Sequence, residues 1–261
     1  MNYSAGVLTP AVPHLTMVVP TYNERDRLEE LVAAVFAACE ARGVALEMVI
    51  VDDNSPDGTG ALADGLKDRF RLQVVHRAGK LGLGTAVVEG FQVASAAIVG
   101  VMDADFSHPP ALVPDLYQAF HDEGADVVVA SRYVPGGSTP DWPLRRRMLS
   151  RTACMLARGL SPIRDAASGF FLIRRDIARG TMIKAGGFKI CLELIVRSGA
   201  SRLVEVPYRF DDRELGDSKM SLREAAGYLV QLRDLYRFRL TSSRRPFHYS
   251  RAAAARRAPS R

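Results

Sequence analysis

The feature of this sequence that most constrains its fold is an alternation of short apolar runs with helical patterns over the first 130 residues. Runs that are apolar throughout predict strands at residues 15–20, 49–52, 72–76, 97–103 and 126–130. Amphipathic stretches between them predict helices at residues 24–42, 58–70, 84–94 and 110–123. Fully apolar strands joined by crossover helices predict an α/β domain, with a parallel sheet covered by helices on both faces.

Length and composition narrow the class of protein. The chain has 261 residues, of which 48% are apolar and 25% charged, and this suits one large core. No apolar run approaches the roughly 20 residues that cross a bilayer, and prolines interrupt the N-terminus, so we expect neither a membrane span nor a secretory signal. The odd number and wide spacing of the cysteines predict reduced structural thiols in a cytoplasmic protein, at Cys39, Cys154 and Cys191.

The formal charge of +6 is distributed unevenly. Residues 1–130 carry 8 Lys and Arg against 18 Asp and Glu, whereas residues 131–243 carry 21 against 11. An acidic front half is poorly suited to hold nucleic acid, whereas a basic rear half suits anionic lipid or phosphate. The arginine-rich tail at 241–261 is expected to be disordered, and either keeps the chain in solution or attracts it weakly to a membrane.

Polar clusters follow three predicted strands at the points where the strands end. They are residues 20–24, residues 52–58 and the Asp103-Ala104-Asp105 segment. Ligands of parallel sheets collect at the carboxyl ends of the strands. A nucleotide-type site at that edge is therefore the first hypothesis, with Asn23 as the predicted N-cap of the following helix.

Asp103 and Asp105 are the predicted metal ligands. They lie one residue apart where a buried strand stops and the chain turns, so both carboxylates can converge on one hard cation. Mg²⁺ and Mn²⁺ take one or two carboxylates and complete their coordination with water and substrate phosphates. The alternative is an ordinary turn, in which aspartates are common.

Two further loops are candidates for nucleotide contacts. One acid of the pair Asp52 and Asp53 is expected to accept hydrogen bonds from a base or ribose, while Ser55 or Asp57 caps the next helix. The glycine-rich segment 79–84 has neither P-loop nor dinucleotide-binding spacing. We expect it to form a tight turn whose backbone approaches a ligand.

A basic helix is predicted within residues 142–164, which hold six arginines and no acid. Its arginine stripe lies opposite an apolar face that includes Leu149 and Leu156, as in helices that lie in a membrane interface. The alternative is a surface helix with a solvated basic face. Arg146 and Ser150 are one turn apart and could reach a single phosphate.

The last third of the chain adds a cationic loop and another amphipathic helix. Arg213 and Lys219 lie on either side of Gly216, an arrangement able to close over phosphates, or simply a solvated charge run. The helix at residues 222–240 carries Leu229 on a face that would dock on the core or contact lipid.

Taken in order, these segments resemble the family-2 glycosyltransferases and, more narrowly, the polyprenol-phosphate (dolichol-phosphate) mannosyltransferases. The resemblance covers about residues 15–240, and so many ordered blocks seldom recur by chance. The matching motifs are VPTYNE at 19–24, VDDNSPDGT at 51–59, KLGLGT at 80–85, DADFSHPP at 103–110, SRY at 131–133, SGF at 168–170 and RELGDSK at 213–219.

The resemblance implies a glycosyltransferase A-type fold, Rossmann-like, with a mixed, mainly parallel sheet between helices. It implies an N-terminal extension at 1–14, a catalytic domain at 15–240 and the tail. Residues implied to contact the nucleotide sugar are Pro20, Tyr22, Glu24, Val51, Asp53, Asp103, Ala104, Asp105, Arg132, Arg213 and Lys219. Residues implied to bind the acceptor phosphate are Arg132, Arg146 and Ser150. Asp103 and Asp105 would hold Mg²⁺ or Mn²⁺, and the implied catalytic residues are Asp105, Arg132, Arg213 and Lys219.

The implied reaction is inverting transfer of mannose from GDP-mannose to a polyprenyl (dolichyl-type) monophosphate, which yields polyprenyl phosphate β-mannose and GDP. The chain would touch the cytoplasmic face of a membrane peripherally, and a separate membrane-anchor subunit is the other route to the bilayer. Nucleic acid is not an expected partner, because the arginine tail lacks interleaved aromatics.

Two departures and two rivals qualify the resemblance. Ser107 stands where some members carry Gln as an extra metal contact, and the Q-x-x-R-W block of processive synthases is absent, which argues against polymer synthesis.

One rival function is that of a polyprenyl-phosphate glucosyltransferase, or of another transferase that uses a UDP-sugar. The other is a non-catalytic peripheral membrane protein with the same fold.

Overall fold

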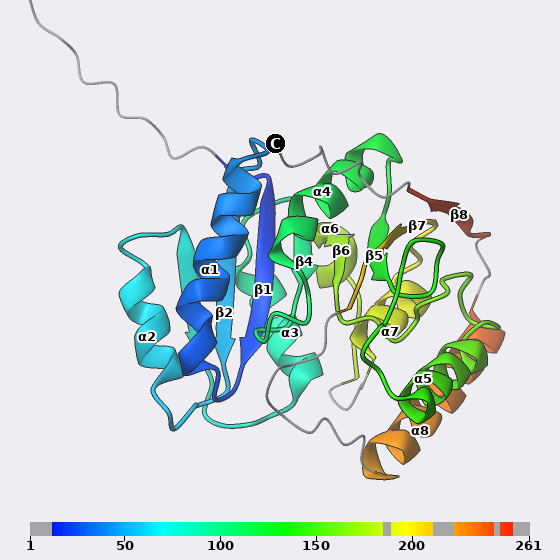
Figure 1. The fold of residues 1–261 in the computed structure, drawn as a ribbon. Helices are drawn as coiled ribbons and strands as arrows, with labels where there is room; N and C mark the ends of the chain where they lie inside the picture. The colour runs from blue at the N-terminus through cyan, green and yellow to red at the C-terminus, as the bar shows by residue number, and fades with distance from the viewer. Residues whose placement is uncertain (1–11, 185–188, 211–221, 243–245, 253–261) are drawn as a thin grey trace, which may run out of the picture.

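The computed structural model describes residues 12–184, 189–210, 222–242 and 246–252, whose strands form one eight-stranded sheet (Figure 1). The strand order is β3-β2-β1-β4-β6-β5-β7-β8. The strands are β1 (Leu15–Thr21), β2 (Leu46–Asp52), β3 (Leu72–His76), β4 (Ile98–Val101), β5 (Val127–Ser131), β6 (Phe171–Arg174), β7 (Arg202–Pro207) and β8 (His248–Arg251).

The sheet is mixed and mainly parallel, as predicted. Strand β6 runs antiparallel to both of its neighbours, β4 and β5, and the other neighbouring pairs are parallel. The five strands predicted in the first 130 residues are all present, with ends shifted by up to three residues. Parallel neighbours need crossover connections, which the intervening helices supply.

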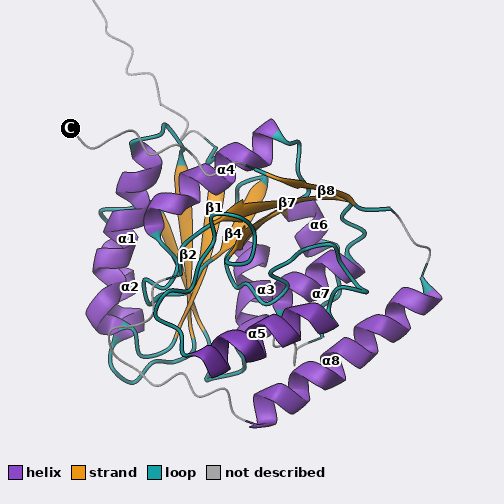
Figure 2. Ribbon diagram, turned by 45° about the vertical axis from the view of Figure 1, so that its right-hand side comes forward, coloured by secondary structure: helices purple, strands orange, loops and turns teal. Residues whose placement is uncertain are grey.

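Helices cover both faces of the sheet (Figure 2). In β1, Leu15, Met17 and Val19 pack into one apolar cluster and Val18 into another, because successive side chains of a strand point to opposite faces. The first cluster also receives α1 (Arg25–Glu40), α2 (Thr59–Leu66) and α4 (Val113–Asp122), which follows the short 3₁₀ turn η1 (Pro110–Leu112). The second receives α3 (Leu83–Val93), α6 (Arg175–Arg179) and α7 (Ile190–Arg197).

Helices α5 (Leu144–Leu156) and α8 (Leu222–Thr241) lie side by side beyond the sheet (Figures 1 and 2). The hydroxyl of Tyr228 donates to the carbonyl of Ala153 at 2.8 Å, and that of Tyr236 to the carbonyl of Leu156 at 2.7 Å. These bonds fix α5 on α8. None of the described helices is both long and apolar enough to span a lipid bilayer.

The structure shows which side of each of these two helices docks on the rest of the protein and which side is exposed. Leu149 and Leu156 of α5 are 48% and 43% exposed, while Cys154 is buried. In α8, Leu229 is 56% exposed, whereas Gln231 is buried because its amide donates to Glu193 Oε2 at 3.0 Å. The docked face of each helix is thus set by hydrogen bonds to its neighbour as well as by apolar residues.

Two other predictions are corrected. Asn23 does not cap α1: it has a left-handed φ of 60°, and the cap residue is Glu24, which makes no capping bond through its side chain. Within the tail predicted to be disordered, residues 248–251 form β8, because β7 offers a free edge and the Tyr249 hydroxyl donates to Glu205 at 2.7 Å. The three cysteines are buried and unpaired, as predicted.

Candidate active site

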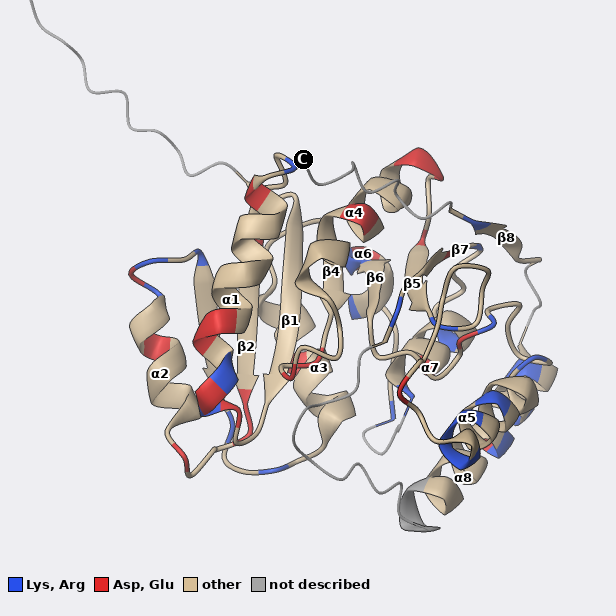
Figure 3. Cartoon of the chain, in the orientation of Figure 1, with Lys and Arg blue, Asp and Glu red and all other residues tan. Residues whose placement is uncertain are grey.

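Most of the predicted site residues that the structure describes lie where β1, β2, β4 and β5 end, at one edge of the sheet. Hydrogen bonds connect the ends of β1, β2 and β4: Asp53 N donates to Thr21 O at 3.1 Å, and Met102 N donates to Val18 O at 3.2 Å. Figure 3 shows acidic residues at the ends of β1 and β2, and basic residues on α5 and α8. The site therefore has an acidic side formed by the strand ends, and α5 brings basic residues next to Arg132.

The loop after β2 holds the start of α1. The backbone N–H of Asn23 donates to Ser55 Oγ at 3.0 Å, and that of Glu24 donates to Thr59 Oγ1 at 3.0 Å. These bonds satisfy N–H groups that the helix itself leaves without partners. Two of the predicted nucleotide residues lie between β1 and α1. Pro20, at the end of β1, is half-buried, and the centre of the exposed Tyr22 ring lies 4.2 Å from Lys80 Nζ. An exposed aromatic ring here offers a surface for a base or ribose.

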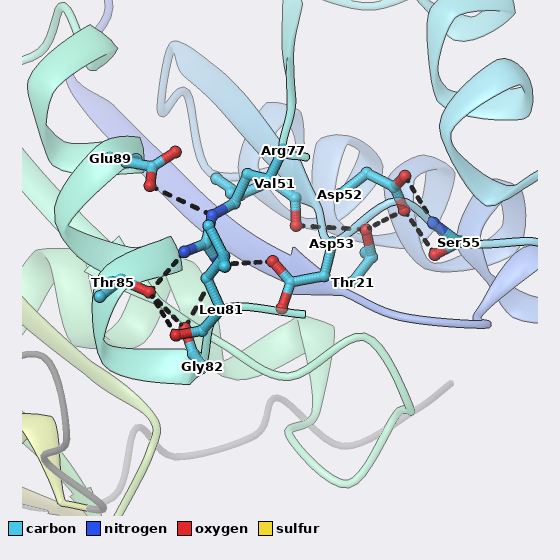
Figure 4. Close-up of polar contacts among 10 residues, drawn as sticks. All are labelled: Thr21, Val51, Asp52, Asp53, Ser55, Arg77, Leu81, Gly82, Thr85 and Glu89. Carbon is cyan, nitrogen blue, oxygen red and sulfur yellow. Dashed lines mark hydrogen bonds and ion pairs between the residues drawn. The ribbon is translucent and has the colours of Figure 1, made fainter. Parts of the chain in front are cut away.

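Asp52 and Asp53 have different tasks. Asp52 accepts hydrogen bonds from Ser55 Oγ at 2.6 Å and Ser55 N at 3.1 Å, so its carboxylate shapes the turn after β2 (Figure 4). Asp57 accepts from Thr59 N at 2.9 Å in the first turn of α2, but the N-cap residue is Gly58, so neither Ser55 nor Asp57 is the predicted cap. Asp53 instead pairs with the buried Arg77, and it is the acid of the pair that is left for a ligand.

The Asp103-Ala104-Asp105 segment follows β4, and His108 supports it. Asp103 N donates to His108 Nδ1 at 2.9 Å, and His108 Nε2 lies 3.7 Å from Asp103 Oδ2. The imidazole is buried and stacks on Phe170 at 4.8 Å between ring centroids. Burial lowers the pKa of His108, which favours the neutral ring, and the hydrogen bond that Nδ1 accepts requires that form.

The carboxylates fit a divalent cation whose other ligands come from water and phosphate. Asp103 and Asp105 supply hard oxygen atoms, and no cluster of three or more His, Cys, Asp or Glu side chains forms among the described residues. Gly169 borders the carboxylate of Asp103, since a Cβ at this position would lie 3.8 Å from Asp103 Oδ1. The backbone N–H of the buried Ser107 donates to Asp105 Oδ1 at 3.0 Å and orients it.

Arg132 follows β5 and is held by Asp165. Its Nε and Nη2 each donate to the carboxylate at 2.7 Å, and its backbone N–H donates at 2.9 Å. Burial alone would lower the pKa of Arg132, but the charge and hydrogen bonds of Asp165 raise it above its usual value. An arginine has five N–H bonds, so this pairing leaves those of Nη1 for a second anion.

The predicted acceptor residues lie on α5, next to Arg132. The guanidinium carbon of Arg146 lies 4.1 Å from the centre of the Trp142 ring, and that of Arg132 lies 5.1 Å from it. Both cations therefore lie beside the same indole ring. Ser150 is half-buried one turn further along the same helix.

The remaining predicted residues are less informative. The side chain of Val51 is fully buried under α3, so only its backbone can face a ligand, and Ala104 is buried too. Arg213 and Lys219 lie outside the described residues.

The sequence analysis did not identify three residues that support the site, which are Arg77, Asp165 and His108. Arg77 directly follows a predicted strand, and His108 belongs to the motif at 103–110, so both had a signal in the sequence.

Comparison with known proteins gives a family and a fold. A model of the family described as "Glycosyl transferase family 2" matches residues 16–181. A dolichol-phosphate mannosyltransferase of Pyrococcus furiosus is 39% identical over 85% of this chain, which spans 63% of the length of that relative. A polyprenol monophosphomannose synthase of Mycolicibacterium smegmatis is 41% identical over 80% of this chain and 83% of its own.

A solved structure shares the fold at low sequence identity. The mannosyltransferase PcManGT from Pyrobaculum calidifontis, in complex with GDP-Man and Mn²⁺, aligns with a TM-score of 0.65 and 19% identity. The alignment covers 90% of this chain and 66% of that one. The glycosyltransferase A-type fold expected from the sequence motifs is therefore confirmed.

Proposed function

Because the chain belongs to glycosyl transferase family 2, we propose that it transfers mannose from GDP-mannose to a polyprenyl monophosphate of the dolichyl type. The observation that carries the proposal is the 39–41% identity to relatives named for this class of reaction. The geometry supports it, since acidic strand ends suited to a nucleotide and a cation face a basic helix suited to a phosphate.

The acceptor decides what chemistry the protein must supply. A phosphate monoester has a second pKa near about 6, so it is already a nucleophilic anion at neutral pH and needs no general base. An oxygen of this phosphate forms a bond to the anomeric carbon from the face opposite the diphosphate. The bond from that carbon to the diphosphate oxygen breaks, its electron pair leaves with GDP, and the configuration inverts.

The residues of the site divide into a group that would bind the donor and a group that would bind the acceptor. Asp53, with Tyr22 and Glu24, would hold the nucleoside, and Asp103 and Asp105 would hold Mg²⁺ or Mn²⁺ beside the diphosphate. When bound, that cation neutralises charge on the departing diphosphate. Arg132 and Arg146 would orient the acceptor phosphate, because both cations lie beside Trp142. Arg213 and Lys219 remain predicted phosphate ligands.

The lipid acceptor requires a surface that meets a membrane, and we assign this role to α5 and α8. The exposed side of α5 carries Leu144, Met148 and Met155, which are 68%, 61% and 62% exposed. The same helix has four arginines and no acid. Apolar side chains flanked by arginines are typical of helices that lie in the interface of an anionic bilayer.

The test is a transfer assay with the full chain, polyprenyl phosphate and Mg²⁺ or Mn²⁺. Radiolabelled GDP-mannose should yield a labelled lipid, and radiolabelled UDP-glucose should not. A chelator should abolish the transfer. Asp105→Asn should slow it by at least about a hundredfold, because it removes a carboxylate that would hold the cation, and the cation stabilises the charge on the leaving diphosphate. Label from UDP-glucose alone, or from neither nucleotide sugar, would refute the proposal.

A further inference from the structure

Arg77 is a charged residue placed inside the protein at the end of β3, and its side chain is only 1% exposed. Its guanidinium donates hydrogen bonds to Asp53 Oδ1 and to Thr85 Oγ1 (Figure 4). It also donates to Glu89 Oε1 at 3.2 Å and to the carbonyl of Gly82 at 3.3 Å. Arg77 therefore joins the acid after β2 to the first turns of α3.

These contacts fix the orientation of the Asp53 carboxylate. The side chain of Asp53 is 10% exposed, and one of its oxygens is held by Arg77. Figure 4 shows the other oxygen, Oδ2, pointing away from Arg77. An aspartate that has lost this partner can turn about its side-chain bonds, whereas the paired one presents Oδ2 in a constant direction.

The pairing also decides which hydrogen-bonding groups a base would meet. An ionised carboxylate only accepts, and the guanidinium of Arg77 is buried and donates to its protein partners. Guanine presents two neighbouring donors, N1–H and the 2-amino group. Uracil presents a single N–H between two carbonyl acceptors, and those acceptors would face a carboxylate.

We propose that Arg77 is a positioning residue that orients Asp53 toward the donor edge of guanine and so sets the preference for a guanine nucleotide. The inference rests on the proposed function, because it assumes that a nucleotide sugar occupies this edge of the sheet. Arg77 itself does not touch the base. It acts through Asp53, and this can be tested by combining the two substitutions.

The experiment measures binding of GDP, IDP and UDP to the full chain by calorimetry in the presence of Mn²⁺. IDP lacks the 2-amino group, so it reports on one hydrogen bond to the carboxylate. The variants are Arg77→Lys, Asp53→Asn and the double variant. Arg179→Lys is the matched control, because Arg179 bonds the carbonyls of Phe91 and Ala94 at the other end of α3.

The wild type should prefer GDP to IDP by about tenfold, the worth of a hydrogen bond to a charged group, and should bind UDP more weakly than either. Arg77→Lys should reduce the GDP-to-IDP ratio toward one and raise the KM for GDP-mannose while leaving kcat within about twofold. The double variant should bind GDP no more weakly than Asp53→Asn alone, and Arg179→Lys should match the wild type.

Unchanged GDP-to-IDP selectivity in Arg77→Lys, or additive losses in the double variant, would overturn the role of Arg77 while leaving the proposed function intact. A wild type that binds no nucleotide, or prefers UDP, would overturn both. If Arg77→Lys does not fold, Thr85→Val removes one anchor of the guanidinium and leaves its charge. It should lower the same ratio, and an unchanged ratio would count against the inference.

Discussion

At the scale of single residues, the site depends on two buried arginines, Arg77 and Arg132, that are paired with carboxylates. Asp165 is fully buried and comes from a loop 33 residues beyond Arg132, with which it forms two parallel hydrogen bonds. Glu205 in turn accepts hydrogen bonds from the backbone N–H of Arg164 and Asp165, at 2.9 and 3.0 Å. The direction of the Arg132 guanidinium is therefore set by β7 as well as by β5.

Asp165→Asn should impair transfer more than it impairs nucleotide binding. The substitution removes the charge that orients Arg132, so we expect kcat to fall at least about tenfold. Breaking a buried ion pair should also lower the free energy of unfolding by about 3–5 kcal/mol. Steady-state kinetics with GDP-mannose and chemical denaturation measure these two effects.

Asp141→Asn is the control, since Asp141 is exposed and next to Trp142 in sequence. It should keep the activity and stability of the wild type. If the Asp165→Asn protein is folded and turns over at the wild-type rate, then the orientation of Arg132 by Asp165 does not contribute to transfer.

At the scale of elements, α5 combines a docked face with an exposed face that carries both apolar and basic groups. Tyr228 and Tyr236 of α8 bind its last turns, and Cys154 lies on its buried face. Met148 and Met155 are on the exposed face, two turns apart. They can therefore be changed without disturbing the contact with α8.

The variant Met148→Ser/Met155→Ser should weaken binding to vesicles of anionic lipid by at least about tenfold, because two apolar side chains no longer move from water into the bilayer interface. Sedimentation with the vesicles measures the bound fraction. Met182→Ser is the matched control, since this methionine is 90% exposed but lies outside α5 and α8. Equal sedimentation of all the proteins would assign membrane contact to another surface.

At the scale of the whole molecule, the local sequence pattern predicts those features of the fold and the site that depend only on residues close together in the chain. The apolar strands of the front half and the positions of Asp53, Asp103 and Asp105 at strand ends follow from runs a few residues long. The pairing of Arg77 with Asp53 spans 24 residues and becomes visible only when β2 and β3 are neighbours. The orientation of α5 on α8 depends on side chains of a second helix, so periodicity within one helix could not give it.

The tail shows the same limit for a strand. Residues 248–251 carry charge and little apolar surface, yet they form β8 because β7 offers backbone partners and Glu205 accepts from Tyr249. The composition of the tail therefore predicts disorder, but backbone pairing with β7 orders residues 248–251.

The most direct test of the account is a crystal structure of the full chain with GDP and Mn²⁺, with data collected for the anomalous signal of manganese. The account predicts one manganese peak in contact with Asp103 and Asp105, the diphosphate bound to that ion, and guanine beside Asp53. GDP bound with no manganese peak at these two carboxylates, or with its base away from Asp53, would contradict it.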